Sequence, residues 1–269
     1  MNSNFKSNYH NFTNKGTCTM NNNFGRSYRN FNNKGNFNMN NKYFDASFDL
    51  NNPAPRCPVI LLLDTSYSMD GQPIRELNAG LRQFIDETSH DEAASMSVEL
   101  EVITFDNKAS IAMPFTTICD VEKNPAPLIA GGITAMGAAL NLAEKELSQR
   151  RIMYKNAGIS SYRPWVILMT DGGPNDEWEK PAEKMRRLAE AGKITYIGIE
   201  IGDSADHCTM CQILPAAPGP VPLQGLKFKQ FFRWLTDSLR SVSASAVSDQ
   251  DNVMYGDISS WAELSKMSI

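Results

Sequence analysis

Three short segments rich in side-chain oxygen atoms are the first candidates for chemistry in this sequence. They are Asp64-Thr65-Ser66-Tyr67-Ser68, Gly132-Ile133-Thr134 and Thr170-Asp171-Gly172. Together they offer carboxylates and hydroxyls, but neither Cys nor His. Hard divalent cations such as Mg²⁺ prefer oxygen ligands, whereas zinc prefers the thiolate and imidazole donors that these segments lack. Their composition therefore predicts a site for Mg²⁺ (or Mn²⁺).

Each segment alone also fits ordinary local structure. Asp-x-Ser-x-Ser after a strand is typical of a helix N-cap or an Asx turn, and Thr-Asp-Gly is common turn chemistry. Their occurrence in order, at three separate strand-to-helix junctions, favours the metal site over these alternatives.

A second candidate is the Cys208-Thr-Met-Cys211 motif, with His207 beside it. A zinc site needs a second pair of ligands, and the remaining cysteines (Cys18, Cys57 and Cys119) do not supply one at suitable spacing. Five cysteines are also too few for a disulfide framework, so reduced thiols are expected. A structural role, a redox-sensitive thiol pair and a metal site all remain open for Cys208 and Cys211.

Apolar patterning predicts the elements that hold these segments. Continuous apolar runs predict buried strands over 58–64, 165–170 and 194–201, and further strands are expected within 97–105 and 109–113. Helical periodicity predicts helices that start near Pro73 and span 134–148, 177–191 and 227–242. Alternating strands and helices indicate an α/β fold: a three-layer, doubly wound, mainly parallel sheet. Ligands in such folds bind at the carboxyl ends of the strands, where the oxygen-rich segments fall.

The chain divides by composition into three parts. Residues 1–52 form an Asn-rich leader with a 19-residue tandem repeat and almost no aliphatic side chains, so disorder is predicted there. Residues 53–245 form the predicted globular domain, and 246–269 a polar C-terminal tail.

The Asp-x-Ser-x-Ser, Thr and Thr-Asp-Gly set resembles the metal-ion-dependent adhesion site of von Willebrand factor A domains. The resemblance implies metal ligation, directly or through water, by Asp64, Ser66, Ser68, Thr134 and Asp171. Longer stretches, among them LLLDTSYSMDGQPIRELNAGL and LQGLKFKQFFRWLTDSLRSVSAS, are similar to the bacterial TerY-type branch found in tellurium-resistance and stress clusters.

This resemblance implies a binding module whose metal is completed by an acidic side chain of a partner protein. An adaptor in tellurite or stress resistance is expected, with a protein phosphatase and a protein kinase as partners. Tyr67, where many relatives carry Gly, and Trp178, expected at the rim of the site, are candidates for partner contact. Simple packing explains Trp178 equally well.

The rival class is a Mg²⁺-dependent phosphohydrolase or phosphotransferase. Asp64 ends a strand, as in enzymes that form an aspartyl-phosphate, but the second acid expected two residues on is Ser66. The sequence contains no phosphate-binding loop, no Gly-x-Ser-x-Gly motif and no histidine placed as a general base near the site. A non-enzymatic protein is therefore predicted.

Charge and hydropathy exclude two classes of partner. The net charge is −4, and residues 51–269 alone carry −8, which disfavours nucleic-acid binding. No apolar window is long enough for a membrane span, and the first thirty residues are too polar for a signal-peptide core. A cytoplasmic location without membrane partners is expected.

Overall fold

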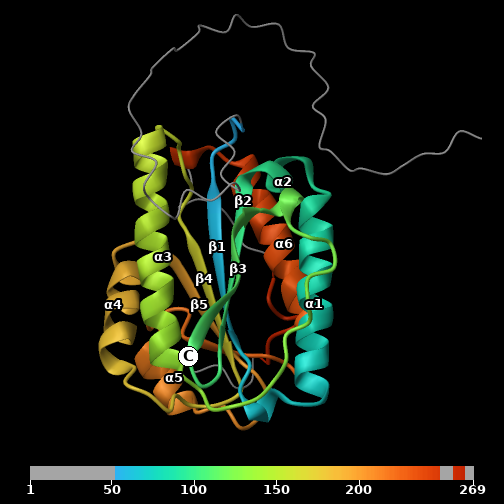
Figure 1. Cartoon of the computed structure of the whole chain (residues 1–269), viewed down its shortest axis with the longest axis vertical. Coiled ribbons are helices and arrows are strands. Elements are labelled where there is room, and N and C mark those ends of the chain that lie inside the picture. The colour runs from blue at the N-terminus through green and yellow to red at the C-terminus, as the bar shows by residue number, and fades with distance from the viewer. Residues whose placement is uncertain (1–51, 249–256, 264–269) are drawn as a thin grey trace, which may run out of the picture. The chain divides into compact units, whose positions relative to one another are not determined.

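A six-stranded sheet forms the middle layer of the protein (Figure 1). The structure is a computed structural model that describes residues 52–248 and 257–263. The strand order is β3-β2-β1-β4-β5-β6, and every neighbouring pair is parallel except β2 and β3. The strands are β1 (Cys57–Asp64), β2 (Val98–Phe105), β3 (Ala109–Thr117), β4 (Trp165–Thr170), β5 (Thr195–Glu200) and β6 (Pro220–Pro222).

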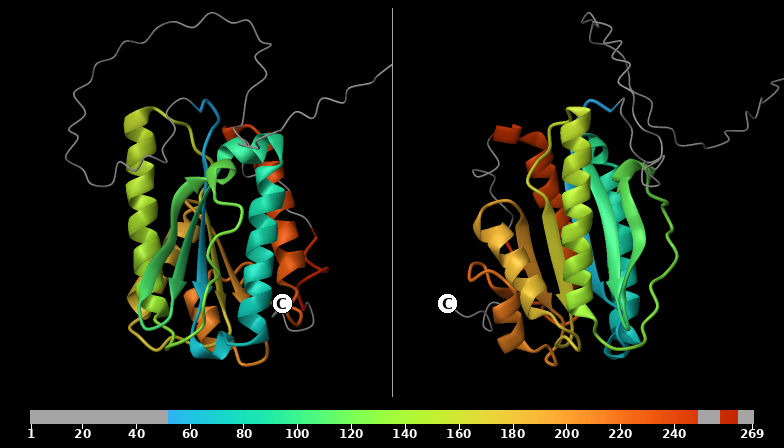
Figure 2. Two further views of the ribbon diagram at one scale, coloured as in Figure 1. Left: turned by 45° about the vertical axis from the view of Figure 1, so that its right-hand side comes forward. Right: turned by 60° about the vertical axis from the view of Figure 1, so that its left-hand side comes forward.

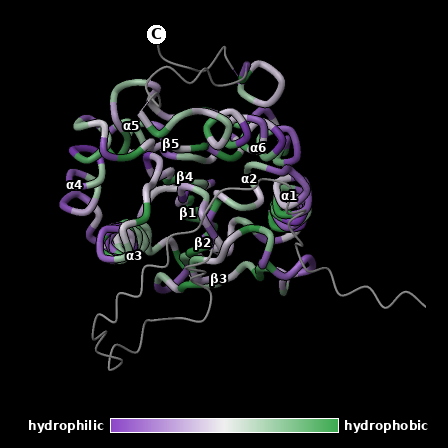
Figure 3. The backbone as a smooth tube through the Cα atoms, turned by 90° about the horizontal axis from the view of Figure 1, so that it is seen from above, coloured by the Kyte–Doolittle hydropathy of each residue, from purple (hydrophilic) through white to green (hydrophobic). Residues whose placement is uncertain are grey.

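Helices cover both faces of this sheet, as Figures 2 and 3 show. One face carries α1 (Gln72–Ser89), α2 (Glu92–Ser97) and α6 (Phe228–Ala244); the other carries α3 (Met136–Ala157), α4 (Glu179–Glu190) and α5 (His207–Ile213). Two 3-10 turns, η1 (Tyr67–Met69) and η2 (Ile118–Asp120), complete the elements. The predicted three-layer, mainly parallel α/β fold is confirmed. Within the described residues, none of the helices combines the length and the apolar character needed to cross a bilayer.

Burial on both faces explains the uninterrupted apolar run of β1. Its odd-numbered side chains, such as Leu61, pack towards α1 and α6, and its even-numbered ones, such as Leu62, pack towards α3. All eight residues of the strand are buried. The sheet therefore has two separate hydrophobic cores, one on each face.

Helix α3 runs two turns beyond the 134–148 span predicted from periodicity. Its last turns carry Arg150 and Tyr154, which are buried although their polar groups make the sequence look exposed. The helix ends at Gly158, whose φ of 67° lies in the left-handed region that favours glycine.

The two predicted end segments lie mostly outside the described residues. The leader over 1–52 lies outside the described residues except for Asn52, which is buried and donates from its side-chain amide to the Met96 carbonyl at 2.7 Å. The polar tail over 246–269 includes residues 257–263, which pack on the β6 edge of the sheet. Trp261 is buried there against the rings of Phe231 and Trp234, two residues of α6. A large aromatic side chain therefore anchors this part of the polar tail in the core.

A buried ionic cluster lies where the strands begin, at the end opposite the predicted metal site. Glu99, on β2, contacts Arg56 Nε at 3.1 Å and Arg150 Nη2 at 2.6 Å. The Tyr154 hydroxyl donates to the same carboxylate. Because two guanidinium groups surround one acid, Glu99 is buried with its charge compensated.

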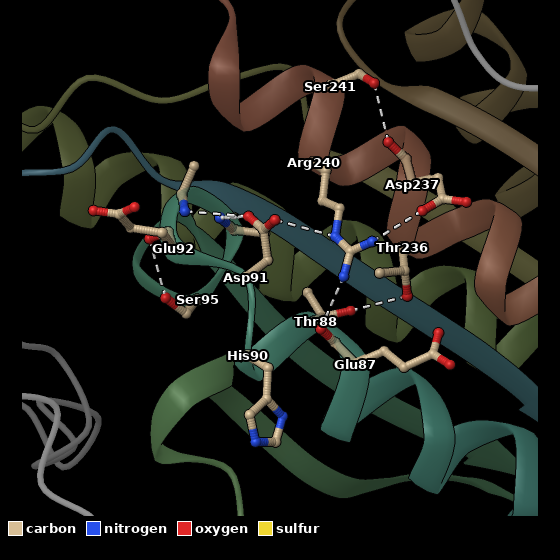
Figure 4. Close-up of polar contacts among 12 residues, drawn as sticks. Glu87, Thr88, His90, Asp91, Glu92, Ser95, Thr236, Asp237, Arg240 and Ser241 are labelled. Atoms are coloured by element: carbon tan, nitrogen blue, oxygen red, sulfur yellow. Dashed lines mark hydrogen bonds and ion pairs between the residues drawn. The ribbon is translucent and has the colours of Figure 1, made fainter.

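A second, more exposed cluster of polar contacts joins α1, α2 and α6, also at the end of the sheet where the strands begin (Figure 4). Arg240 of α6 contacts Asp91 and Asp237 at 3.1 Å each. Asp91 also caps α2 by accepting hydrogen bonds from two backbone N–H groups. The Thr88 and Thr236 hydroxyls, 3.1 Å apart, connect α1 to α6 directly.

Candidate metal centre

Asp64 and Thr170 end the neighbouring parallel strands β1 and β4, so their side chains meet at one edge of the sheet. The Thr170 hydroxyl donates to Asp64 Oδ2 at 2.6 Å, and the Ser66 backbone N–H donates to Asp64 Oδ1 at 2.8 Å. Asp64 is fully buried. Its carboxylate therefore holds together the first loop of the site and the end of β4.

The two serines connect this loop to the second aspartate. Ser66 Oγ and Ser68 Oγ lie 3.0 Å apart, and the Ser68 hydroxyl donates to Asp171 Oδ1 at 2.7 Å. Asp171 is only 8% exposed. Four of the five predicted ligands thus form a continuous chain of polar contacts together with Thr170.

The fifth predicted ligand, Thr134, lies buried just before α3, and backbone hydrogen bonds bring its loop to the same place. The Tyr67 N–H donates to the Gly132 carbonyl at 3.1 Å, and the Gly131 N–H to the Thr65 carbonyl at 2.8 Å. These bonds tie the Thr134 loop to the serine loop.

Two residues that were not predicted complete the framework. Asn175 Oδ1 accepts from the Thr134 N–H at 3.0 Å, while the Asn175 N–H donates to the Thr134 carbonyl at 2.9 Å. Asp176 accepts from the N–H groups of Gly137 and Ala138, both at 2.8 Å, and so caps α3. The Pro-Asn-Asp run marks a turn in the sequence, but nothing in it indicates that the partners lie about forty positions upstream.

Gly137 allows α3 to approach this framework closely. A Cβ atom at this position would lie 2.2 Å from the Glu177 carbonyl oxygen, so only glycine fits without a backbone shift. The first turn of α3 is therefore packed directly on the segment that carries Asn175 and Asp176.

The electrostatics of the site are those of two uncompensated acids. Burial raises the pKa of Asp64, an effect that hydrogen bonds from Ser66 and Thr170 oppose and nearby Asp171 reinforces. Burial also raises the pKa of Asp171, and the Ser68 hydroxyl opposes this rise. In the described part of the chain neither carboxylate forms an ion pair with a Lys or Arg.

This donor set fits a hard divalent cation. Two buried acids would repel each other without a counter-charge, and the adjacent hydroxyls supply further neutral oxygen ligands. Among the described residues no three Asp, Glu, His or Cys side chains gather as a metal-binding group. A cation here would therefore depend on the hydroxyls of Ser66, Ser68 and Thr134 as well as on the carboxylates.

The two residues considered for partner contact lie in different settings. Tyr67, between the two serines, is 74% exposed. Trp178 is half-buried and packs against the hydrophobic core on the α3 side of the sheet. Ile133, next to Thr134, is 52% exposed and was not singled out from the sequence.

Solved structures resemble this fold at low sequence identity. A von Willebrand factor type A protein from Catenulispora acidiphila superimposes with a TM-score of 0.52 at 20% identity, over 70% of this chain and 43% of that one. Proximal thread matrix protein 1 from the mussel byssus gives a TM-score of 0.50 at 21% identity, over 69% and 48% of the two chains. The pilus adhesin SpaC from Lactobacillus rhamnosus GG gives 0.53 at 13% identity, over 70% and 31%.

Sequence comparison points to the same family. An uncharacterized protein of Synechocystis sp., sll0103, is 27% identical in a 190-residue alignment, which covers 66% of this chain and 41% of that protein. The chain therefore spans less than half the length of this relative. The family model for the von Willebrand factor type A domain matches residues 59–220, which include all five predicted ligands. With this match and the six-stranded sheet that carries the site, the chain belongs to the von Willebrand factor type A domain family.

Proposed function

We propose that this protein is a metal-dependent adaptor that binds a partner protein through a Mg²⁺ or Mn²⁺ ion. Asp64, Ser66, Ser68, Thr134 and Asp171 would hold the ion, which supplies a positive centre for an acidic side chain of the partner. The domain performs no bond-breaking in this role.

One observation carries the proposal: two acids are buried beside the hydroxyls of Ser66, Ser68 and Thr170 without a basic partner among the described residues. Burying two carboxylates costs free energy unless a cation compensates them. A divalent ion provides that compensation and retains capacity for a further anionic ligand.

The surface around the site supports recognition of a partner with mixed chemistry. Tyr67 and Ile133 project from the two loops that carry Ser66 and Thr134, and both are more than half exposed. Exposed apolar side chains beside a polar centre are typical of contact surfaces. The acidic residue of the partner is therefore expected to have apolar neighbours.

The finer assignment comes from sequence resemblance. Stretches similar to the TerY-type branch favour an adaptor in tellurite or stress resistance, acting in the cytoplasm with a protein phosphatase and a protein kinase. Von Willebrand factor type A domains generally serve as interaction modules, which favours this role over the phosphohydrolase or phosphotransferase alternative.

Titration calorimetry with Mg²⁺ and Mn²⁺ tests the metal site. Wild type is expected to bind one ion, and Asp64→Asn and Asp171→Asn to lose it. Thr134→Ala should weaken binding, whereas the matched variant Thr134→Ser keeps the hydroxyl and should bind nearly as wild type. Equal affinities for wild type and the two aspartate variants would refute the site.

Affinity capture with a protein phosphatase and a protein kinase as the proposed partners tests the adaptor role. Capture is expected with Mg²⁺, and excess chelator or Asp171→Asn should abolish it. Added salt should weaken it little, because the domain itself is acidic and direct ligation must outweigh long-range repulsion. Capture that persists in chelator would place the interface elsewhere, and Mg²⁺-dependent phosphate release lost in Asp64→Asn would establish the enzymatic alternative.

A further inference from the structure

A cluster of four reactive side chains lies on and beside α5, and none of its members is one of the five candidate metal ligands. Its carboxylate comes from the end of β5, which pairs with Thr170 at the end of β4. It consists of Glu200, His207, Cys208 and Cys211, and we refer to it as the thiol cluster. Met210 and Ile213 anchor α5 in the core. Both cysteines are exposed to solvent. They are three positions apart on the helix and so share its outer face.

Three members of the thiol cluster form a line of contacts. Glu200 ends β5, is buried, and lies with its two carboxylate oxygens 3.0 and 3.1 Å from His207 Nδ1. His207 Nε2 lies 3.5 Å from Cys211 Sγ. A carboxylate that accepts from Nδ1–H leaves Nε2 as the acceptor facing the thiol.

This order of groups matches the requirements of an activated thiol. A cysteine becomes a nucleophile when an adjacent base removes its proton, and the base works best when a third group orients it. Burial, Glu200 and Cys208 raise the pKa of Cys211, so at neutral pH the thiol needs such a base. The contacts from Glu200 to His207 and from His207 to Cys211 supply both the base and the group that orients it.

We propose that Cys211 is a nucleophilic thiol that exchanges with small disulfides such as glutathione disulfide, with His207 as its base and Cys208 as the resolving thiol. Glu200 is a positioning residue that holds the His207 ring. This proposal does not rest on the proposed metal-binding function, because it uses none of the five candidate metal ligands.

The exchange balances without a further reactant. His207 Nε2 takes the Cys211 proton, and the thiolate attacks one sulfur of glutathione disulfide. A mixed disulfide forms, and the released glutathione thiolate takes the proton from His207. The Cys208 thiolate then attacks Cys211 Sγ, a disulfide forms between Cys208 and Cys211, and a second glutathione leaves with the Cys208 proton. The two protein thiols are oxidised and one glutathione disulfide is reduced to two thiols.

The test follows the reduced full-length chain by mass spectrometry during incubation with glutathione disulfide. Cys18→Ser serves as the background so that the leader thiol does not contribute. The background is expected to lose the two thiol hydrogens, and Cys208→Ser in this background to accumulate the glutathione adduct on Cys211. Cys211→Ser should react at least about tenfold more slowly, while the matched variant Cys119→Ser should react as the background does.

The pH profile separates a base from a structural group. His207→Gln is expected to react about tenfold more slowly than the background near pH 7 and to reach the background rate as the pH rises above the pKa of the thiol, where the thiolate forms without a base. Glu200→Gln should show a smaller loss near pH 7 and the same recovery. Equal rates for His207→Gln and the background near pH 7, or equal rates for Cys211→Ser and the background, would overturn the proposal.

Discussion

Two ends of the same sheet bury acidic side chains in opposite electrostatic settings. Where the strands begin, Glu99 is enclosed by Arg56, Arg150 and the Tyr154 hydroxyl. Where the parallel strands end, Asp64 and Asp171 are surrounded by hydroxyl and amide groups and lack a basic partner among the described residues.

The difference shows which end is structural and which is available for binding. The protein itself compensates the charge of Glu99, so this cluster needs nothing from solution. Under the proposed function, an external cation compensates the charges of Asp64 and Asp171. A buried acid therefore indicates a ligand only when its surroundings supply hydrogen bonds without opposite charge.

The largest effect on stability is expected when the compensated charge of Glu99 is removed. Glu99→Gln leaves two buried guanidinium groups without their acid and should lower the free energy of unfolding by about 3–5 kcal/mol. Denaturant titration measures this loss. Glu87→Gln is the control because Glu87 meets Arg233 at the surface, and it should change stability by less than about 1 kcal/mol. Similar losses in the free energy of unfolding of the two variants would contradict the structural role of Glu99.

Glu101 extends the comparison between compensated and uncompensated acids. It lies two residues from Glu99 on β2, but its negative charge is less well compensated by nearby basic groups. Burial, together with Glu146, raises the pKa of Glu101 to about 8, although Arg150 and the Phe115 backbone oppose the rise. The folded protein therefore holds this proton more tightly than the unfolded chain. The contribution of Glu101 to stability is complete below its unfolded pKa and is lost as the pH rises through about 8.

The slope of this loss approaches about 1.4 kcal/mol per pH unit between roughly pH 5 and pH 8. Glu101→Gln cannot titrate, so its free energy of unfolding should fall less over this window and exceed that of wild type at the upper end. Chemical denaturation across the window measures both slopes. Parallel curves would show that Glu101 titrates normally in the folded protein.

Asp64→Asn tests the uncompensated end. In metal-free buffer the variant should be at least as stable as wild type, because an amide carries no charge to bury and can still pair with Ser66 and Thr170. Mg²⁺ at about 100 times its dissociation constant should stabilise wild type by about 2.7 kcal/mol and the variant not at all. Thermal unfolding with and without Mg²⁺ makes the comparison. A strongly destabilised metal-free variant would show that the Asp64 charge is compensated within the protein.

The smallest effect is expected at the exposed Arg240 cluster. Arg240→Met keeps much of the aliphatic stem but loses the contacts with Asp91 and Asp237, and it should cost about 1 kcal/mol or less because solvent screens these ion pairs. Denaturant titration of both variants compares the free energy of unfolding lost with the exposed ion pairs of Arg240 to that lost with the buried ion pairs of Glu99. A loss as large as that of Glu99→Gln would contradict the distinction.

The sequence predicts the sheet and the meeting of the three oxygen-rich segments because these follow from local patterns. Continuous apolar runs such as PVILLLD and WVILMT are typical of buried strands in a doubly wound fold. The carboxyl ends of parallel strands lie at the same edge of the sheet. Asp64 and Thr170 therefore meet without any information beyond their places in β1 and β4.

Pairings between distant segments could not be predicted in this way. Glu99 and Glu101 alternate with apolar residues on β2, a pattern that normally places charges in solvent. Only the arrival of Arg56 and Arg150 makes the burial of the Glu99 charge favourable. Asn175 and Trp261 likewise sit in polar stretches, and their roles depend on Thr134 and on the rings of α6. In each case the deciding partner is far away in the chain.

The segment 257–263 has a consequence for self-association. An open sheet edge can pair with a strand from another molecule and so initiate aggregation. Here Ala262 bridges Leu223, and the Glu263 N–H donates to the Pro222 carbonyl, which leaves β6 occupied on that side. Pro220 and Pro222 also lack backbone donors. A shortened chain that ends near residue 245 would uncover the apolar surface that Trp261 covers, and such a chain is expected to self-associate through this surface, because the two prolines limit strand addition at the edge itself.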